Sequence, residues 1–351
     1  GEVLAYRVDA GGSVARVAVT SDGSGITQVP TTGTSQRYVL AAAGAVRTPA
    51  VAPMPAAMPL IAGQVDYLMI APAVLHDALQ PLVQYHQSLG RTVKVVEPND
   101  IYEAYSHGVV DAAAIDRYLA AAVPAMDVRW VLLVGADSVD YRDFDHDGSY
   151  SLMPSMYGST GYGITYAPMD PAYGDVDGDG VQDVAMGRMP ARTPSELSVL
   201  VAKTLAYAAG SSRTAMLASD ANGGIDFQAA NDTTEAGLAG WAVERSDVDA
   251  LGATAARNAL LAAMQDGTGL VMYLGHSSSL EWTEVGLFDT ATASSLSGDP
   301  TMVVQFGCWN TYYVSPDADT LAHALLLNPN GGAALVAGSS TLTSSGNDML
   351  M

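Results

Sequence analysis

Short apolar runs alternate with helix-patterned segments through most of the chain, and this alternation constrains the fold more than any other feature. From Asp66 onward, runs such as residues 67–70, 130–135 and 270–274 have the length and composition of buried strands. Segments with apolar side chains at helical spacing lie between them. Repeated strand–helix units predict an α/β architecture, in which helices cover both faces of a mainly parallel sheet.

The periodicity also places the individual elements. The expected strands are 67–70, 92–96, 130–135, 183–187, 215–218, 242–244, 270–274 and 301–306. The expected helices are 73–89, 111–123, one that begins near Thr193, 231–238 and 253–264. The stretch 138–183 lacks periodicity and is longer than a structureless loop in a compact domain should be, so we expect it to serve a function.

Residues 1–60 follow a different pattern. Val3–Val8 and Val14–Val19 are typical of short strands, and a turn-like cluster lies between them. Thr48–Pro59 is rich in Pro and Ala, which favours an extended, semi-rigid linker. We therefore expect a β-rich N-terminal segment with its linker (1–60, a propeptide or a domain remnant), a first α/β subdomain (61–210) and a second one (211–351).

The charge balance excludes several classes of partner. The 351 residues include 15 Lys and Arg against 37 Asp and Glu, a formal net charge of −22. Affinity for nucleic acid comes mainly from Lys and Arg, so nucleic acid is excluded as a partner. No membrane insertion is expected, because the long uncharged run 48–65 contains four prolines. The acidic, Ser/Thr/Gly-rich composition favours a secreted or cell-surface protein whose signal peptide lies outside this sequence. The oligomeric state stays open.

Two reactive side chains follow apolar strands. His276 comes after the strand 270–274, and Cys308, the single cysteine, comes after 301–306. Open α/β sheets build their sites at the carboxyl ends of strands, where neighbouring ends would bring imidazole and thiol together. A thiol needs such a base to be a thiolate near neutral pH. Alone, Cys308 would be interpreted as a small buried hydrophobe and His276 as a hydrogen-bonded strand-end histidine; together they favour a catalytic pair.

Several motifs occur in a characteristic order. The most specific are Tyr273-Leu274-Gly275-His276, Trp282 and Gly307-Cys308-Trp309-Asn310, and weaker ones lie at 66–70, 106–108, 132–135 and 186–193. In these motifs the chain, from about Asp66 to Met351, resembles the gingipain-like cysteine peptidases, relatives of the caspases, legumains and clostripains. The resemblance implies a caspase-like α/β sandwich with two side-by-side subdomains, protein or peptide substrates, and a catalytic dyad of His276 and Cys308.

The resemblance also implies roles for the residues around this dyad. The backbone N–H groups of Ser277 and Cys308 would form the oxyanion hole, although the family usually has Gly where Ser277 stands. Asp170 is the best match for an acidic residue that supports His276. A turn residue before a proline is the alternative interpretation of Asp170.

The resemblance also implies which side chain is preferred before the cleaved bond. Relatives favour Arg or Lys before the cleaved bond, through an acidic residue in the pocket, and Asp179 falls near that place. Trp282 and Glu281 are expected to wall the same pocket. The family domain usually continues past the position of Met351, so the chain is expected to lack a last strand or helix.

Aspartates in the aperiodic stretch have the spacing of a calcium-binding loop. Carboxylates at loop positions 1, 3, 5 and 9, with Gly at position 6 for the sharp turn, suit Ca²⁺. A solvated acidic turn is the alternative interpretation, since neither loop has Glu at position 12. Zinc is disfavoured and no organic cofactor is expected. The expected calcium ligands are Asp175, Asp177, Asp179, the carbonyl of Val181 and Asp183 in one loop, and Asp143, Asp145 and Asp147 in the other.

Two functions are compatible with these features. The first is an exported cysteine endopeptidase that hydrolyses peptide bonds through an acyl-enzyme on Cys308. The alternative is a calcium-stabilised interaction module on a catalytically silent peptidase fold, because a fold does not guarantee its chemistry. The reactivity of the Cys308 thiol distinguishes the two.

Overall fold

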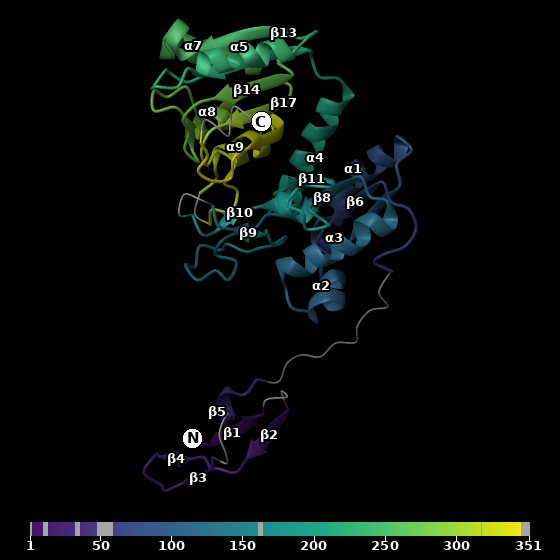
Figure 1. Cartoon of the computed structure of the whole chain (residues 1–351), viewed down its shortest axis with the longest axis vertical. Helices are drawn as coiled ribbons and strands as arrows, with labels where there is room; N and C mark the ends of the chain where they lie inside the picture. Colours follow the sequence, from purple (N-terminus) through teal and green to yellow (C-terminus); the bar gives the residue numbers. More distant parts are fainter. Residues whose placement is uncertain are drawn as a thin grey trace. The chain divides into compact units, whose positions relative to one another are not determined.

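The structure is a computed structural model that describes residues 2–9, 13–31, 36–47, 59–160, 164–316 and 318–344. The chain divides into two compact units, Gly1–Ala57 and Met58–Met351 (Figure 1). Apart from Pro59, the linker expected over 48–59 lies outside the described residues. Each unit is described by itself below.

The smaller unit contains a three-stranded antiparallel sheet in the order β2-β1-β5. Its only buried apolar side chain among the described residues is Ala5. A sheet that buries so little apolar surface gains little stability from its own packing. The bounds are β1 Val3–Val8, β2 Val14–Val17, β3 Thr20–Ser21, β4 Thr27–Gln28, β5 Arg37–Ala42 and a 3₁₀ turn at Ala43–Ala45.

The first half of the larger unit is built on a parallel four-stranded sheet in the order β11-β8-β6-β7. Alternate side chains point to opposite faces. Leu68 and Ile70 pack with helices α2 and α3, whereas Met69 packs with α1 and α4. The bounds are β6 Tyr67–Ile70, α1 His76–Ser88, β7 Val93–Val96, α2 Pro98–Ser106, α3 Ala112–Met126, β8 Trp130–Val134, β11 Ala185–Met189 and α4 Pro194–Ala209.

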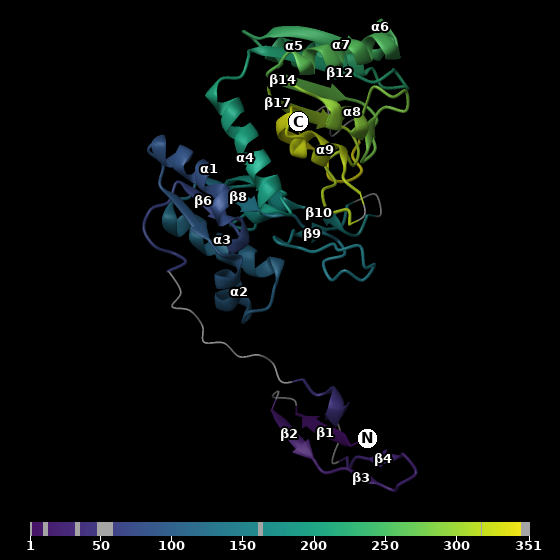
Figure 2. The same cartoon turned by 180° about the vertical axis from the view of Figure 1, so that it is seen from behind.

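A second parallel sheet, of five strands, has the order β13-β12-β14-β17-β18. Side chains of α7, α8 and α9 form one core with β12, β14 and β17, and α5 lies against β12 and β14 (Figure 2). The bounds are β12 Thr214–Ser219, α5 Phe227–Gly237, β13 Ala242–Asp247, α6 Val248–Leu251, α7 Ala253–Gln265, β14 Leu270–Leu274, α8 Thr290–Ser295, β17 Thr301–Phe306, α9 Leu321–Leu327 and β18 Ala333–Gly338.

Helix α4 joins the two sheets. It begins after Thr193, whose side chain accepts a hydrogen bond from the N–H of Glu196, and Pro194 occupies its first turn. Lys203 on this helix is buried and donates to the carbonyls of Leu325, Leu326 and Asn328, at 2.7, 3.0 and 3.1 Å. Burial lowers the pKa of Lys203 to about 7. The ammonium group thus satisfies carbonyls at the end of α9 and ties that helix to α4.

The predicted α/β class is confirmed, with differences in detail. The helix expected over 73–89 opens as a 3₁₀ turn at Ala73–Leu75, and the strand expected over 183–187 lies at Ala185–Met189. The described residues of the stretch 138–183 form only short elements. These are β9 Tyr157–Gly158, β10 Ala167–Pro168 and a 3₁₀ turn at Asp170–Gly174, and a similar small pair, β15 Glu281–Trp282 and β16 Phe288–Asp289, follows β14.

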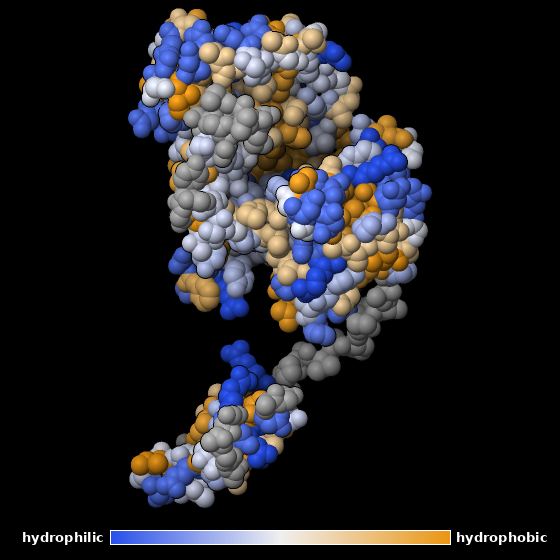
Figure 3. Space-filling model, in the orientation of Figure 1, coloured by the Kyte–Doolittle hydropathy of each residue, from blue (hydrophilic) through white to orange (hydrophobic). Residues whose placement is uncertain are grey.

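The surface of the larger unit is hollowed on the face shown in Figure 3, and apolar side chains line this hollow. Within the described ranges, no helix is both long and apolar enough to cross a membrane.

Candidate active site

His276 and Cys308 lie at the ends of neighbouring strands. Strands β14 and β17 pair in parallel, with Leu274 opposite Phe306, and each reactive residue stands two positions beyond its strand. The two loops touch directly, because the hydroxyl of Ser277 donates to the carbonyl of Cys308 at 2.8 Å. The parallel register therefore brings the predicted dyad to one edge of the sheet.

The backbone of His276 is held from both sides. Its N–H donates to a carboxylate oxygen of Asp220 at 3.1 Å, and its carbonyl accepts from the hydroxyl of Tyr273 at 2.5 Å. The N–H of Thr283 donates to the same carbonyl at 2.9 Å. The side chain of His276 is exposed, with the Phe227 ring edge-on to the imidazole at a centroid distance of 5.6 Å. The backbone of His276 is thus fixed, while its imidazole stays accessible.

Tyr273 is suited to act as a donor. It is fully buried, and burial, followed by the charge of Asp220, raises its pKa well above the ordinary value. The phenol therefore keeps its proton over the whole physiological range. Its ring stacks on that of Trp282, with centroids 4.4 Å apart and planes 3° from parallel.

Cys308 is half-buried and lies against the segment that follows β18. Its sulfur is 3.5 Å from the backbone N of Thr343 and 3.6 Å from the carbonyl oxygen of the same residue. Within the described chain, neither the N–H of Cys308 nor that of Ser277 has an acceptor. Among the described residues, both N–H groups are therefore available to donate to a bound substrate.

A groove of about 730 Å³ adjoins this thiol through Thr343. Met169, Phe306 and Asp175 line it, and both carboxylate oxygens of Asp175 accept from backbone N–H groups of its own loop. The groove lies between the acidic loop after the 3₁₀ turn 170–174 and the ends of β17 and β18. It has the size of a cleft that takes one large side chain with its flanking backbone.

Trp282 does not wall a pocket. Its side chain is fully buried, and its indole N–H donates to the side-chain oxygen of Gln305 at 2.7 Å. It packs in the core beneath the two loops, so a substrate cannot reach it. Glu281, its neighbour on β15, is exposed.

The carboxylate of Asp170 is bound by Arg188 and not, as expected, by His276. Its two carboxylate oxygens accept hydrogen bonds from Arg188, at 2.5 and 2.9 Å. Arg188 also donates to the carbonyls of Gly135 and Met153, both at 2.8 Å, and lies over the ring of Tyr313. With both oxygens engaged by a buried guanidinium, Asp170 is a structural anion. The supporting role expected for it at His276 is not supported.

The acidic residue that does touch His276 is Asp220, which the sequence analysis missed. It follows β12, the strand beside β14, so it stands at the same sheet edge. Its second oxygen accepts from the N–H of Ala221 at 2.7 Å. The available signal was the same one that led to His276 and Cys308, a polar residue directly after an apolar strand.

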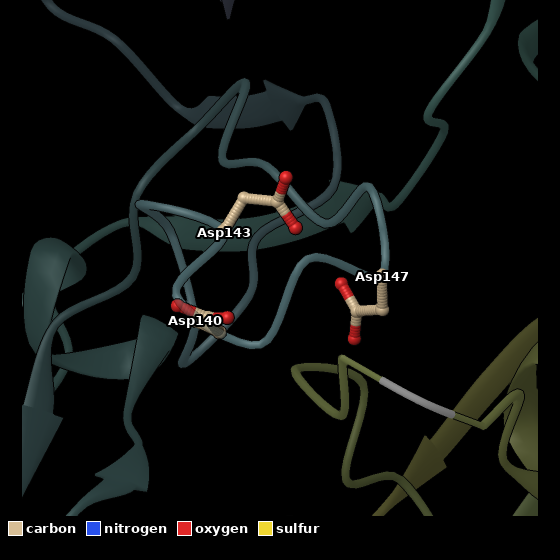
Figure 4. Close-up of side chains that lie close together, drawn as sticks. All are labelled: Asp140, Asp143 and Asp147. Atoms are coloured by element: carbon tan, nitrogen blue, oxygen red, sulfur yellow. The ribbon is translucent and has the colours of Figure 1, made fainter.

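Two groups of aspartates in the stretch 138–183 can hold a metal ion. In each, one carboxylate oxygen from every member lies within 4.8 Å of the others. One group is Asp140, Asp143 and Asp147, whose side chains converge from a single loop (Figure 4); the other is Asp175, Asp177 and Asp183.

These groups differ from the predicted ligand sets. Asp140 replaces Asp145 in the first, and it accepts from the N–H groups of Asp145 and Phe144, which lower its pKa. Asp179 lies outside the second group, where its side chain accepts from the N–H of Val181. Gly180 has the left-handed conformation expected of it, with φ of 89°.

A thiol and an imidazole at one edge of a parallel sheet are the groups that a cysteine hydrolase uses. The model of peptidase family C25 matches residues 61–351. The chain therefore belongs to this family, the gingipain family of cysteine-type endopeptidases.

Two solved structures are similar to this chain, and the first of them supports the caspase-like fold. One, described as a structure of a protease, is 19% identical with a TM-score of 0.64, and the match covers 83% of this chain and 62% of that one. Another, dimeric latent PorU from Porphyromonas gingivalis, is 18% identical with a TM-score of 0.42, and the match covers 58% of this chain and 22% of PorU. No curated protein matches the chain. The chain thus spans about 62% of the first structure's length.

Proposed function

We propose that this chain is an exported endopeptidase that works through a dyad of Cys308 and His276. The observation that carries the proposal is the pairing of β14 with β17, which sets both residues at adjacent strand ends. The Cys308 thiolate attacks the carbonyl carbon of the scissile bond and forms a C–S bond. His276 then donates a proton to the leaving amine as the C–N bond breaks.

Hydrolysis of the resulting thioester uses the same groups. His276 takes a proton from a water molecule, the hydroxide attacks the acyl carbon, and the Cys308 thiolate leaves. The N–H groups of Ser277 and Cys308 stabilise the oxyanion in both steps, and each such donor contributes about 3–4 kcal/mol in measured cases. Asp220 keeps the His276 backbone in place through the 3.1 Å hydrogen bond.

A basic side chain before the cleaved bond fits the groove beside Cys308. Met169 and Phe306 offer apolar contact to an aliphatic stem, and the aspartate-rich loop beside the groove offers negative charge to its head group. A fluorogenic peptide library that varies this position tests activity and preference together. The proposal expects fastest cleavage after Arg or Lys; cleavage confined to other residues overturns the preference, and no cleavage that depends on Cys308 overturns the function.

We further propose that the two aspartate groups bind Ca²⁺ and hold the loops of 138–183 in place. Carboxylate oxygens are hard ligands, and their mutual distance of at most 4.8 Å suits one ion with ligands at about 2.3–2.6 Å. The groove residue Asp175 is a member of one group, so the bound ion would also order the groove.

Chelation tests this role. An ion at 100 times its dissociation constant stabilises the native state by roughly 2.7 kcal/mol. Excess EGTA should lower both the melting temperature and turnover, and Ca²⁺ should restore them where Mg²⁺ does not. Unchanged melting and turnover would mean that the aspartates form only a solvated acidic surface.

A further inference from the structure

The turn that carries Cys308 has a strained backbone. Trp309, the residue after the thiol, has a φ of 62°, in the left-handed region that a bulky side chain rarely adopts. Such a conformation persists only where the surroundings hold it, and it is frequent at functional sites. The contacts of this turn therefore show what holds the nucleophile in its position.

The peptide group between Cys308 and Trp309 is fixed at both of its polar atoms. Its carbonyl accepts from the hydroxyl of Ser277 at 2.8 Å. Its N–H donates to the carbonyl of Thr341 at 3.0 Å. With both atoms engaged, the peptide plane cannot rotate without breaking a hydrogen bond, and rotation of that plane is what would relax Trp309.

The Ser277 hydroxyl is itself held by buried side chains. The amide nitrogen of Asn310 lies 3.3 Å from it and 3.4 Å from the carbonyl of Gln305. The amide of Gln305 donates to the carbonyl of Asn310 at 3.0 Å, and its oxygen accepts from Trp282. Gln305, Asn310 and Trp282 are all fully buried. The hydroxyl is thus part of a rigid core network beneath the site.

The space around Ser277 is equally restricted. A Cβ on Gly307 would collide with the Ser277 hydroxyl and would lie 2.6 Å from the carbonyl oxygen of Gly275. Gly307 is therefore required here because the serine side chain lies directly over it. The loop of His276 and the loop of Cys308 are packed as one unit.

We propose that the Ser277 hydroxyl is a positioning group that couples the His276 loop to the Cys308 turn. It stabilises the strained turn, and it fixes the Ser277 backbone whose N–H faces the oxyanion. This inference rests on the proposed peptidase function. It gives a role to the side chain at a position where the resemblance to gingipain-like peptidases predicts Gly.

Substitution of this one hydroxyl tests the proposal. Ser277→Ala keeps the Cβ and the backbone N–H and removes only the hydroxyl, with its hydrogen bonds to the Cys308 carbonyl and the Asn310 amide. Ser277→Gly, the residue usual in the family, removes the side chain entirely. Ser279→Ala in the same loop is the matched control, because its hydroxyl makes no hydrogen bond among the described residues. Each protein is assayed with the best peptide of the fluorogenic library and with the aldehyde of that peptide, which adds reversibly to the thiol and puts an oxygen in the oxyanion position.

We expect Ser277→Ala to lower kcat about tenfold, the effect of one lost hydrogen bond, with little change in KM. The inhibition constant of the aldehyde should rise by the same factor, because only the oxyanion geometry has changed. Ser277→Gly should lose at least as much, and Ser279→Ala should match the wild type.

Three results would overturn the inference. The first is a kcat within about twofold of the wild type in both Ser277 variants, and the second is a change in KM alone. The third is a decrease in both kcat and melting temperature while the inhibition constant of the aldehyde stays unchanged. If Ser277→Ala does not fold, Ser277→Gly gives the same comparison at the same position, and Asn310→Ser gives it from the partner side. Failure of the proposed function itself is distinct, since the wild type would then show no hydrolysis that Cys308→Ala abolishes.

Discussion

Replacement of Asp170 by Ala should destabilise the larger unit while leaving its chemistry intact. The side chain of Arg188 is only 6% exposed, and Asp170 supplies its one anionic partner among the described ion pairs. Burial lowers the pKa of Arg188, but Asp170, together with the nearby Tyr313 and Asp137, more than offsets that effect, so the pKa is raised. Removal of one partner of a buried pair leaves an uncompensated charge and costs about 3–5 kcal/mol.

The expected shift in melting temperature follows from the size of the unit. A unit of about 290 residues unfolds with an entropy near 0.6 kcal/mol/K, so the loss corresponds to about 5–8 °C. Differential scanning calorimetry gives this shift, and turnover is measured per titratable Cys308 thiol. Asp319→Ala is the control, because its pair with Arg192 is about half exposed and contributes less than about 1 kcal/mol.

Two outcomes distinguish a structural role of Asp170 from a role in supporting His276. A lower melting temperature with turnover per active thiol near that of the wild type supports the structural role. An unchanged melting temperature with turnover reduced by orders of magnitude would refute it, because Asp170 would then act on His276 despite its contacts with Arg188.

Two further predictions concern His323 and Asp220. Burial lowers the pKa of His323 to about 4. As the pH falls below about 6.5, the unfolded chain therefore binds a proton that the native state does not bind, and the free energy of unfolding decreases. The His323 side chain accepts from the N–H of Thr320 and so caps α9, and Gln can accept in the same way. His323→Gln should therefore retain about 2 kcal/mol that the wild type loses between about pH 7.5 and 5; denaturant titrations of the two proteins with identical pH dependence would contradict this. Asp220→Ala leaves the His276 N–H without its acceptor and should lower kcat at least about tenfold with normal alkylation of Cys308, whereas unchanged kcat would remove Asp220 from the site.

The placement of His276 and Cys308 could be predicted from the sequence because it depends on local patterns. Apolar runs identify parallel strands, and a parallel sheet collects the residues after its strands at one edge. His276 and Cys308 both follow this rule, and their strands prove to be neighbours. Asp220 follows it too, but strand order is a long-range property, and nothing near Asp220 in the sequence shows that β12 lies beside β14.

The remaining differences arise where a side chain's partner is distant in the chain. Asp170 pairs with Arg188, and Trp282 donates to Gln305, 23 positions away. Asp140 joins an aspartate group because the loop folds back on it, which a fixed ligand spacing does not describe. Spacing thus identified the acidic loops but did not select their ligands.

The proposed role of Cys308 as a nucleophile with His276 as its acid and base can be tested by following alkylation of the thiol and peptide hydrolysis in the same sample. Purified chain is treated with iodoacetamide near pH 6, and the fraction of Cys308 modified is followed by mass spectrometry beside the residual peptide hydrolysis. We expect activity to fall in proportion to the fraction of Cys308 modified. We also expect His276→Ala to abolish hydrolysis and to slow the alkylation of Cys308. Full hydrolysis by a chain whose Cys308 is completely alkylated would contradict it.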